Sequence, residues 1–254
     1  MYTYPNEQNG RCPHKSPVSK SGKPAAPRRS TYRHGDLQRA LLEAGVALAQ
    51  EGGPAAVVLR EATRRVGVVP NAAYRHFKGH AALFEAVRAE GLARLAEAMQ
   101  REMALVRGAD AASHARGLLS AVGRGYLGFA QQETGLFRTA FASGPYDVGR
   151  AAGLGGAAQP NAIDAATPAV PRATADSVRA NPFLLLKSAL DAMAEAGVLS
   201  PAQRAGAEFL AWSAVHGMAF LLIEGPLRHA GQAERTGLAE RLLGMVDLGL
   251  AKPA

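Results

Sequence analysis

The sequence is poor in the features that mark secreted and membrane proteins. It contains one cysteine, Cys12, so no disulfide bond can form within the chain. It has no apolar run of about eighteen residues, the length that suggests a membrane-spanning helix. The first thirty residues also lack the apolar segment of a secretory signal. These absences predict a protein of the reducing cytoplasm that has no contact with a membrane.

Motifs of catalysis and of metal binding are also missing. The chain has no G-x-S-x-G turn, which would present a nucleophile, and no GxxxxGK loop, which would hold a phosphate. His76 and His80 have the spacing of two zinc ligands on one helix, but Gly79 lies between them and no cysteine or carboxylate completes the set. We therefore predict no catalytic site, no metal site and no cofactor, and we do not expect an enzyme.

The positive charge is concentrated at one end of the chain. Residues 1–80 carry 13 Lys and Arg against 5 Asp and Glu, whereas residues 81–254 carry 16 of each, so the net charge of +8 belongs to the first third. This division predicts a polyanion-binding unit joined to a neutral body. The alternative is a basic tail that only keeps the protein soluble.

Residues 1–31 contain five prolines and almost no large aliphatic residues. Such a segment cannot bury enough apolar surface to offset the entropy of ordering, so we expect a disordered basic arm. Its cations would add affinity for phosphates of any sequence. Insertion into a minor groove is the alternative role.

One stretch, Leu59–His80, has the pattern of a helix-turn-helix. Leu59–Val66 is a helix candidate, Gly67 ends it, and Pro70 can open a second helix that stops by Gly79. Asparagine can bond an adenine edge, tyrosine and histidine can donate to phosphates, and arginine can do either. The candidate DNA contacts are Arg60, Pro70, Asn71, Ala72, Tyr74, Arg75, His76 and His80. The alternative is a solvated surface turn.

The rest of the chain shows apolar residues at helical spacing, which predicts an all-α fold. His80–Val106 is the longest candidate, a rod of about 38 Å that would join the DNA-binding unit to the body. The other helices are predicted over Gly35–Gln50, Ala111–Gln132, Leu136–Phe141, Asp176–Ala196 with a kink or break at Pro182, Pro201–Ile223 and Glu234–Leu248. Residues 143–175 have no apolar period and are expected to form a flexible loop.

The helices between residues 111 and 224 supply most of the aromatic residues of the body. We expect them to enclose a largely apolar cavity for a small apolar ligand. The candidate lining is Phe129, Phe137, Phe141, Phe183, Leu186, Met193, Trp212, His216 and Phe220. Taken singly, each of these residues could equally be part of the ordinary core of a helix bundle.

Several short motifs together carry a resemblance to a known family. RHGDL near the start of the first helix, LRE at the start of the second, GV in the turn and YRHF at the end resemble the N-terminal domain of TetR-family repressors over Tyr32–Phe84. The match departs from the family at Val69, which replaces a capping Ser or Thr, and at His80, which replaces a Lys that touches phosphate. WSAVHG at Trp212–Gly217 and YLGFA at Tyr126–Ala130 resemble the subgroup with a WHG-type C-terminal domain.

The resemblance implies a ligand-responsive repressor. It would form a homodimer through its last two helices and place two recognition helices about 34 Å apart on a near-palindromic operator. The domains would be a basic arm over residues 1–31, a helix-turn-helix domain over 32–79, and a ligand-binding and dimerisation domain over 80–250. The alternative is an all-helical small-molecule-binding protein or enzyme that has only nonspecific affinity for polyanions.

Overall fold

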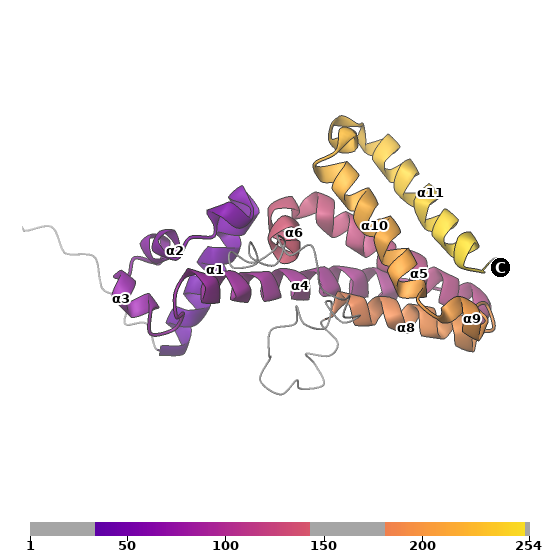
Figure 1. The fold of residues 1–254 in the computed structure, drawn as a ribbon, viewed down its shortest axis with the longest axis horizontal. Helices are drawn as coiled ribbons and strands as arrows, with labels where there is room; N and C mark the ends of the chain where they lie inside the picture. The colour runs from indigo at the N-terminus through magenta and orange to yellow at the C-terminus, as the bar shows by residue number, and fades with distance from the viewer. Residues whose placement is uncertain (1–33, 143–180, 252–254) are drawn as a thin grey trace, which may run out of the picture. The chain divides into compact units, whose positions relative to one another are not determined.

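The structure is a computed structural model that describes residues 34–142 and 181–251, and every regular element within these two ranges is helical. Figure 1 shows the order of these helices. The expected basic arm, the expected loop over 143–175 and the predicted helical residues from Asp176 onward to 180 lie outside the described residues. No helix in the described ranges is long and apolar enough to cross a membrane.

The first three α-helices form a small unit, called here the head. It consists of α1 (His34–Gly52), the short 3-10 helix η1 (Pro54–Ala56), α2 (Leu59–Val66) and α3 (Pro70–Ala73). Gly67 ends α2 in a left-handed conformation with φ 74°, which a residue without a side chain adopts at little cost. Buried Leu41, Ala62, Ala73 and Phe77 contribute to the core of this unit.

The second helix of the helix-turn-helix is shorter than the sequence predicts. It ends at Ala73, and the chain continues as a turn in which the amides of His76 and Phe77 both donate to the carbonyl of Ala73. Val69 provides no side-chain oxygen to cap the start of α3, and Gly79 turns the chain at φ 115° into the next helix. The predicted continuous helix toward Gly79 is therefore wrong beyond its first turn.

The long helix α4 (His80–Ala104) joins the head to the body. Its 25 residues span about 38 Å at 1.5 Å per residue. The N-terminal part of α4 contacts α1, where Gly45 lets Leu83 and Val87 approach the α1 backbone closely. The helix also packs on α5, α6 and α8 (Figure 1). One helix thus belongs to both the head and the body.

The body is built on α5 (Ala111–Gln132), α6 (Thr134–Phe141) and α8 (Pro182–Glu195). Asp110 caps α5 by accepting from the amide of Ser113 at 2.7 Å. Pro182 occupies the first helical position of α8, with Asn181 as the cap. The proline therefore begins the helix and does not kink it, because that position has no hydrogen bond to lose.

The C-terminal helices are α9 (Pro201–Arg204), α10 (Ala207–Ile223) and α11 (Gln232–Ala251), with η3 (Pro226–His229) between the last two. The single helix predicted over Pro201–Ile223 is wrong at its start. Gly206 adopts a left-handed conformation with φ 75° and separates α9 from α10. Figure 1 shows α10 and α11 side by side, and the two helices are in contact.

The backbones of α4 and α5 approach each other closely at Gly125, because a Cβ there would stand 2.5 Å from the Cα of Met99. We expect Gly125→Ala to lower the free energy of unfolding by about 1–3 kcal/mol, since the two helices must separate. Gly128→Ala on the same helix is the control. Its Cβ meets only the end of Gln132, at 4.0 Å, so it should be neutral or stabilising by up to about 1 kcal/mol. Chemical denaturation of both variants checks this, and equal stabilities would contradict it.

Candidate nucleic-acid interface and apolar cavity

The turn and second helix of the helix-turn-helix present a polar face to solvent. Four side chains of this face are exposed: Pro70, Asn71, Tyr74 and Arg75. Two others, Ala72 and His76, are half-buried. Ala73 and Phe77, which alternate with them, are buried in the head. Thr63 is also buried, and its hydroxyl donates to the carbonyl of Arg60 at 2.7 Å. The candidate contact residues of this segment therefore gather on the outer side of the head.

Acidic neighbours neutralise two of the arginines on α2. Arg64 donates to Glu61 at 2.7 Å and Arg65 donates to Glu51 at 2.6 Å. The hydrogen bond from Arg64 is the main reason why the pKa of Glu61 falls to about 2. The positive charge of each of these two arginines is therefore already balanced by a carboxylate of the protein itself.

Three other cations of the head make no ion pair within the described ranges: Arg60, Arg75 and Lys78. All three are exposed. Lys78 is absent from the candidates derived from the sequence. Its position directly after the YRHF motif is the signal that could have included it.

His80 has a contact that the sequence does not reveal. Its Nε2 lies 2.6 Å from the carbonyl oxygen of Val57, so this nitrogen carries the proton and donates. The ring also stacks on Phe84, with centroids 6.1 Å apart. His80 is exposed, but one of its nitrogens ties the start of α4 to the segment before α2.

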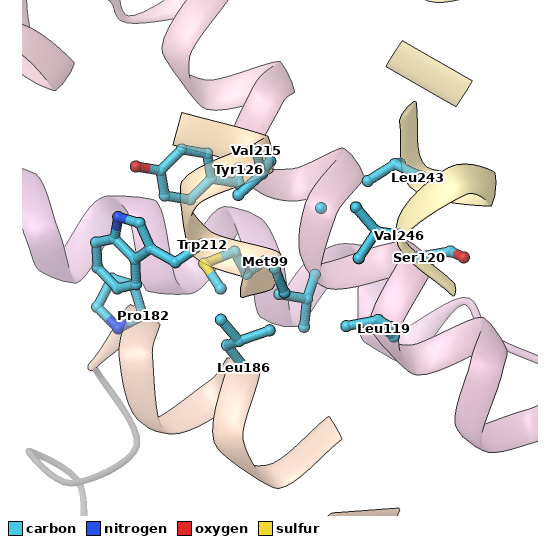
Figure 2. A pocket seen from close by; sticks show the side chains of 13 residues that line it. Met99, Leu119, Ser120, Tyr126, Pro182, Leu186, Trp212, Val215, Leu243 and Val246 are labelled. Carbon is cyan, nitrogen blue, oxygen red and sulfur yellow. The ribbon is translucent and has the colours of Figure 1, made fainter. Parts of the chain in front are cut away.

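The body contains an apolar cavity between five helices (Figure 2). It leaves about 30 Å³ for water-sized molecules, which is room for about two waters. Of the expected lining residues, Leu186 and Trp212 line this cavity. The full lining is Met99, Leu119, Ser120, Val122, Gly123, Tyr126, Pro182, Leu186, Ala211, Trp212, Val215, Leu243 and Val246.

Next to the cavity, the aromatic cluster consists of Tyr126, Phe137, Phe141, Phe183, Trp212 and His216. The Tyr126 ring centroid lies 5.4 Å from that of Phe137, 6.0 Å from Phe141 and 6.2 Å from Trp212. Phe183 packs on Trp212 at 5.5 Å. Four expected pocket residues, Phe137, Phe141, Phe183 and His216, thus lie beside the cavity without lining it.

The polar centre of this cluster is a hydrogen bond of 2.7 Å between the Tyr126 hydroxyl and Nδ1 of His216. Burial raises the pKa of the Tyr126 hydroxyl and lowers the pKa of His216. Both groups are therefore held neutral, and the tautomer of His216 sets which of the two donates. His216, one of the lining residues expected from the sequence, already has a partner on α5.

The remaining expected pocket residues lie elsewhere. Phe129 is buried and borders a polar groove formed by α4 and α5. Met193 is fully buried in the core, and Phe220 is 55% exposed on α10. The sequence analysis missed the two cavity residues from α11, Leu243 and Val246, because it considered only the helices up to residue 224.

Helix α6 touches both the aromatic cluster and the head. Phe137 and Phe141 face Tyr126, whereas Gly135 lies so close to the carbonyls of Ala49 and Gln50 that a Cβ would collide with them. The side chain of Gln50 donates to Glu133, just before α6, at 2.8 Å. A shift of α6 would therefore be felt directly at the end of α1.

Two family models match parts of this chain. The model described as bacterial regulatory proteins, tetR family, matches residues 41–87, and the model described as tetracyclin repressor-like, C-terminal domain, matches residues 119–246. No curated protein matches the chain.

Two solved structures from Rhodococcus are similar. One is a protein of unknown function from Rhodococcus sp. RHA1, which is 24% identical with a TM-score of 0.61, and the match covers 88% of this chain and 100% of that one. The other is a bacterial regulatory protein in the tetR family from Rhodococcus RHA1, which is 17% identical with a TM-score of 0.49, and the match covers 83% and 96%. The first supports the fold.

The lowered pKa of His216 predicts a pH dependence of stability. Unfolded, this histidine takes up a proton near pH 6.5, whereas burial keeps the folded form neutral to lower pH. Its contribution to stability is therefore present above pH 6.5 and is lost as the pH falls through the folded pKa. We expect His216→Gln, which cannot titrate, to lose less stability than the unchanged protein between about pH 7.5 and 5.5. Denaturation at each pH checks this against His114→Gln, an exposed control that should behave like the unchanged protein. If the free energy of unfolding of His216→Gln depended on pH as steeply as that of the unchanged protein, this prediction would be wrong.

Proposed function

This chain belongs to the TetR family of bacterial regulatory proteins and is a DNA-binding transcriptional regulator, and from this premise we propose that it is a homodimeric repressor released by a small apolar ligand. Its C-terminal domain is of the WHG type. The observation that carries the proposal is the outward polar face at Asn71–His76, on a head in which three cations make no ion pair with any described residue. We take residues 32–79 as the DNA-binding domain and residues 80–250 as the ligand-binding and dimerisation domain.

In the proposed complex α3 and the turn after it enter the major groove. Asn71 pairs with an adenine edge, Tyr74 and His76 contact phosphates, and Arg75 reaches either. Pro70 and Ala72 lie along the base edges, and Arg60 and His80 approach the phosphate backbone from the flanks. His80 keeps one ring nitrogen for such a contact while the other holds Val57.

The proposed dimer forms through α10 and α11. Their solvent side carries large apolar residues that no described element covers: Phe220 and Leu221 on α10, Met245 and Leu248 on α11. Gly217 and Gly244 have open space above them on the same two helices, so a partner's helices could approach closely. A second copy of the chain would bury this surface and hold two heads about 34 Å apart on a near-palindromic operator.

Release by ligand needs two states of the protein that the ligand and the operator favour differently. The cavity is bounded by α4 at Met99, and α4 also packs on α1 of the head. Helix α6 joins the aromatic cluster to the end of α1 through Gly135. A ligand that moves α4 or α6 would change the spacing of the heads, and by reciprocity operator DNA would weaken ligand binding.

The recognition residues are tested on an operator that the full-length protein selects from random DNA duplexes. We expect Asn71→Ala to weaken binding to the selected duplex by roughly tenfold to a hundredfold, which corresponds to one lost base contact. Tyr74→Ala should weaken binding by a smaller factor, since it contacts only a phosphate. Lys187→Ala, an exposed cation on α8, is the control and should bind normally. Unchanged affinity in Asn71→Ala, with native helix content, would refute the assigned contact.

The proposed dimer surface is tested by introducing carboxylates into it. Leu221→Glu combined with Leu248→Glu places four carboxylates in the proposed symmetric interface, so we expect this variant to be a monomer while the unchanged protein is a dimer. Leu105→Glu is the control, because Leu105 is 70% exposed at the end of α4, outside this surface. Sedimentation equilibrium measures the mass of each. A dimeric double variant, or a monomeric unchanged protein, would refute this interface.

A further inference from the structure

The cavity of the body has walls that hold no charge. Among the described residues that line it there is no Asp, Glu, Lys, Arg or His. Figure 2 shows the hydroxyls of Tyr126 and Ser120 at opposite ends of the lining, each turned away from its middle. The Tyr126 hydroxyl is engaged with His216. A molecule in this cavity therefore meets hydrocarbon, aromatic faces and the sulfur of Met99.

Such walls select strongly by charge. An ionised group that enters them loses its water and gains no partner, and this costs several kcal/mol or more. An uncharged apolar molecule loses little and gains contacts. The lining chemistry therefore restricts the occupant to an uncharged, hydrocarbon-like molecule.

The cavity is also too small for most ligands as it stands. About 30 Å³ is far below the 300–1,000 Å³ of typical pockets for drug-sized molecules. A ligand must therefore displace part of the wall. At least one of the five helices that line the cavity must therefore move when a ligand binds.

Helix α11 is the wall with the least packing. Of its 20 residues only Leu243 and Leu250 are buried, whereas α5 buries ten. Leu243 fills the space over Gly123 on α5, where a Cβ would collide with it. Besides this contact, α11 is tied to α5 by ion pairs of Arg116 with Asp247 at 2.7 Å and of Arg124 with Glu240 at 3.8 Å.

We propose that an uncharged, hydrocarbon-like ligand enters by replacing the Leu243 side chain beside Gly123 and thereby moves α11 away from α5. The proposal rests on the proposed function, since it names the chemical class of that ligand and the element that it moves. Met245 and Leu248 stand on the same helix and belong to the proposed dimer surface. Ligand binding and dimerisation are then coupled, and each changes the affinity of the other by the same factor.

Ligand binding in the cavity can be followed by tryptophan fluorescence, because Trp212 is the only tryptophan of the chain and lines the cavity. The probes are cyclohexane and methylcyclohexane, with cyclohexanecarboxylate and cyclohexylammonium as charged counterparts of similar size. At pH 7.5 we expect the two hydrocarbons to change the Trp212 emission saturably and the two ions to bind at least roughly a hundredfold more weakly. Equal binding of an ion, or no saturable binding of either hydrocarbon, would overturn the assigned ligand class.

Displacement of α11 is measured by amide hydrogen exchange with and without cyclohexane. We expect faster exchange in residues 237–250 on binding, while α5 amides are unchanged or slower. Sedimentation with cyclohexane should show a shifted dimer dissociation constant. Occupancy without either response would overturn the α11 displacement.

Two matched variants separate this mechanism from a general loosening of the helix. Leu243→Ala vacates the space beside Gly123, so cyclohexane should bind several-fold more tightly and no longer speed the exchange of α11. Leu250→Ala makes the same change at the other buried residue of α11, equally 7% exposed but outside the cavity, and should keep the response of the unchanged protein. If Leu243→Ala does not fold, Leu243→Val gives the same comparison with a smaller change. A full α11 response in the Leu243 variant refutes the proposal.

Failure of this inference differs from failure of the proposed function. If the protein selects an operator and dimerises but α11 does not respond to the hydrocarbons, only the inference falls. If no operator is selected, the proposed function falls, while the fluorescence and exchange measurements still decide the ligand class and the moving helix.

Discussion

The structure depends on the continuous apolar face of α4. Leu83, Phe84 and Val87 bury its first part against the head, and Leu95, Ala98 and Met99 bury its second part in the body. Because one rigid helix supplies both cores, neither can be repacked without consequence for the other. Gly125 strengthens this constraint by bringing the α5 backbone close to Met99, which also lines the cavity. The helix that borders the cavity at Met99 is therefore the same helix that packs on the head.

A second connection runs through α6. Phe137 and Phe141 pack on Tyr126 and His216, while Gly135 seats the helix on the end of α1. Arg88 of α4 donates to the carbonyl of Ala140, and Arg138 pairs with Glu224 at the end of α10. The short helix is thus held by α1, α4, α5 and α10 together. A displacement of α6 would therefore disturb contacts with all four of these helices.

Prediction from the sequence was most accurate where the signals are local. Gly67 and the apolar period predicted α2 and α5 with the bounds that they have in the structure. The continuous Pro201–Ile223 helix failed because Gly206 is a single residue whose left-handed conformation outweighs a strong apolar pattern. Of the residues named for the cavity, only Leu186 and Trp212 line it. Phe137, Phe141 and His216 pack on Tyr126 and Phe183 packs on Trp212 beside it, whereas Phe129, Met193 and Phe220 lie elsewhere.

The sequence by itself determined the all-helical class, the helix-turn-helix and the family, because capping residues, glycines and apolar periodicity act within a few residues of one another. Only the tertiary structure decided which buried faces meet. It pairs Arg65 of α2 with Glu51 of α1 while Arg60, Arg75 and Lys78 make no ion pair in the described ranges, and it brings Leu243 of α11 onto Gly123 of α5. Helical periodicity indicates that a face is buried but does not identify the helix that covers it. That partner is set by packing between residues distant in the sequence, as Gly123 and Leu243 are.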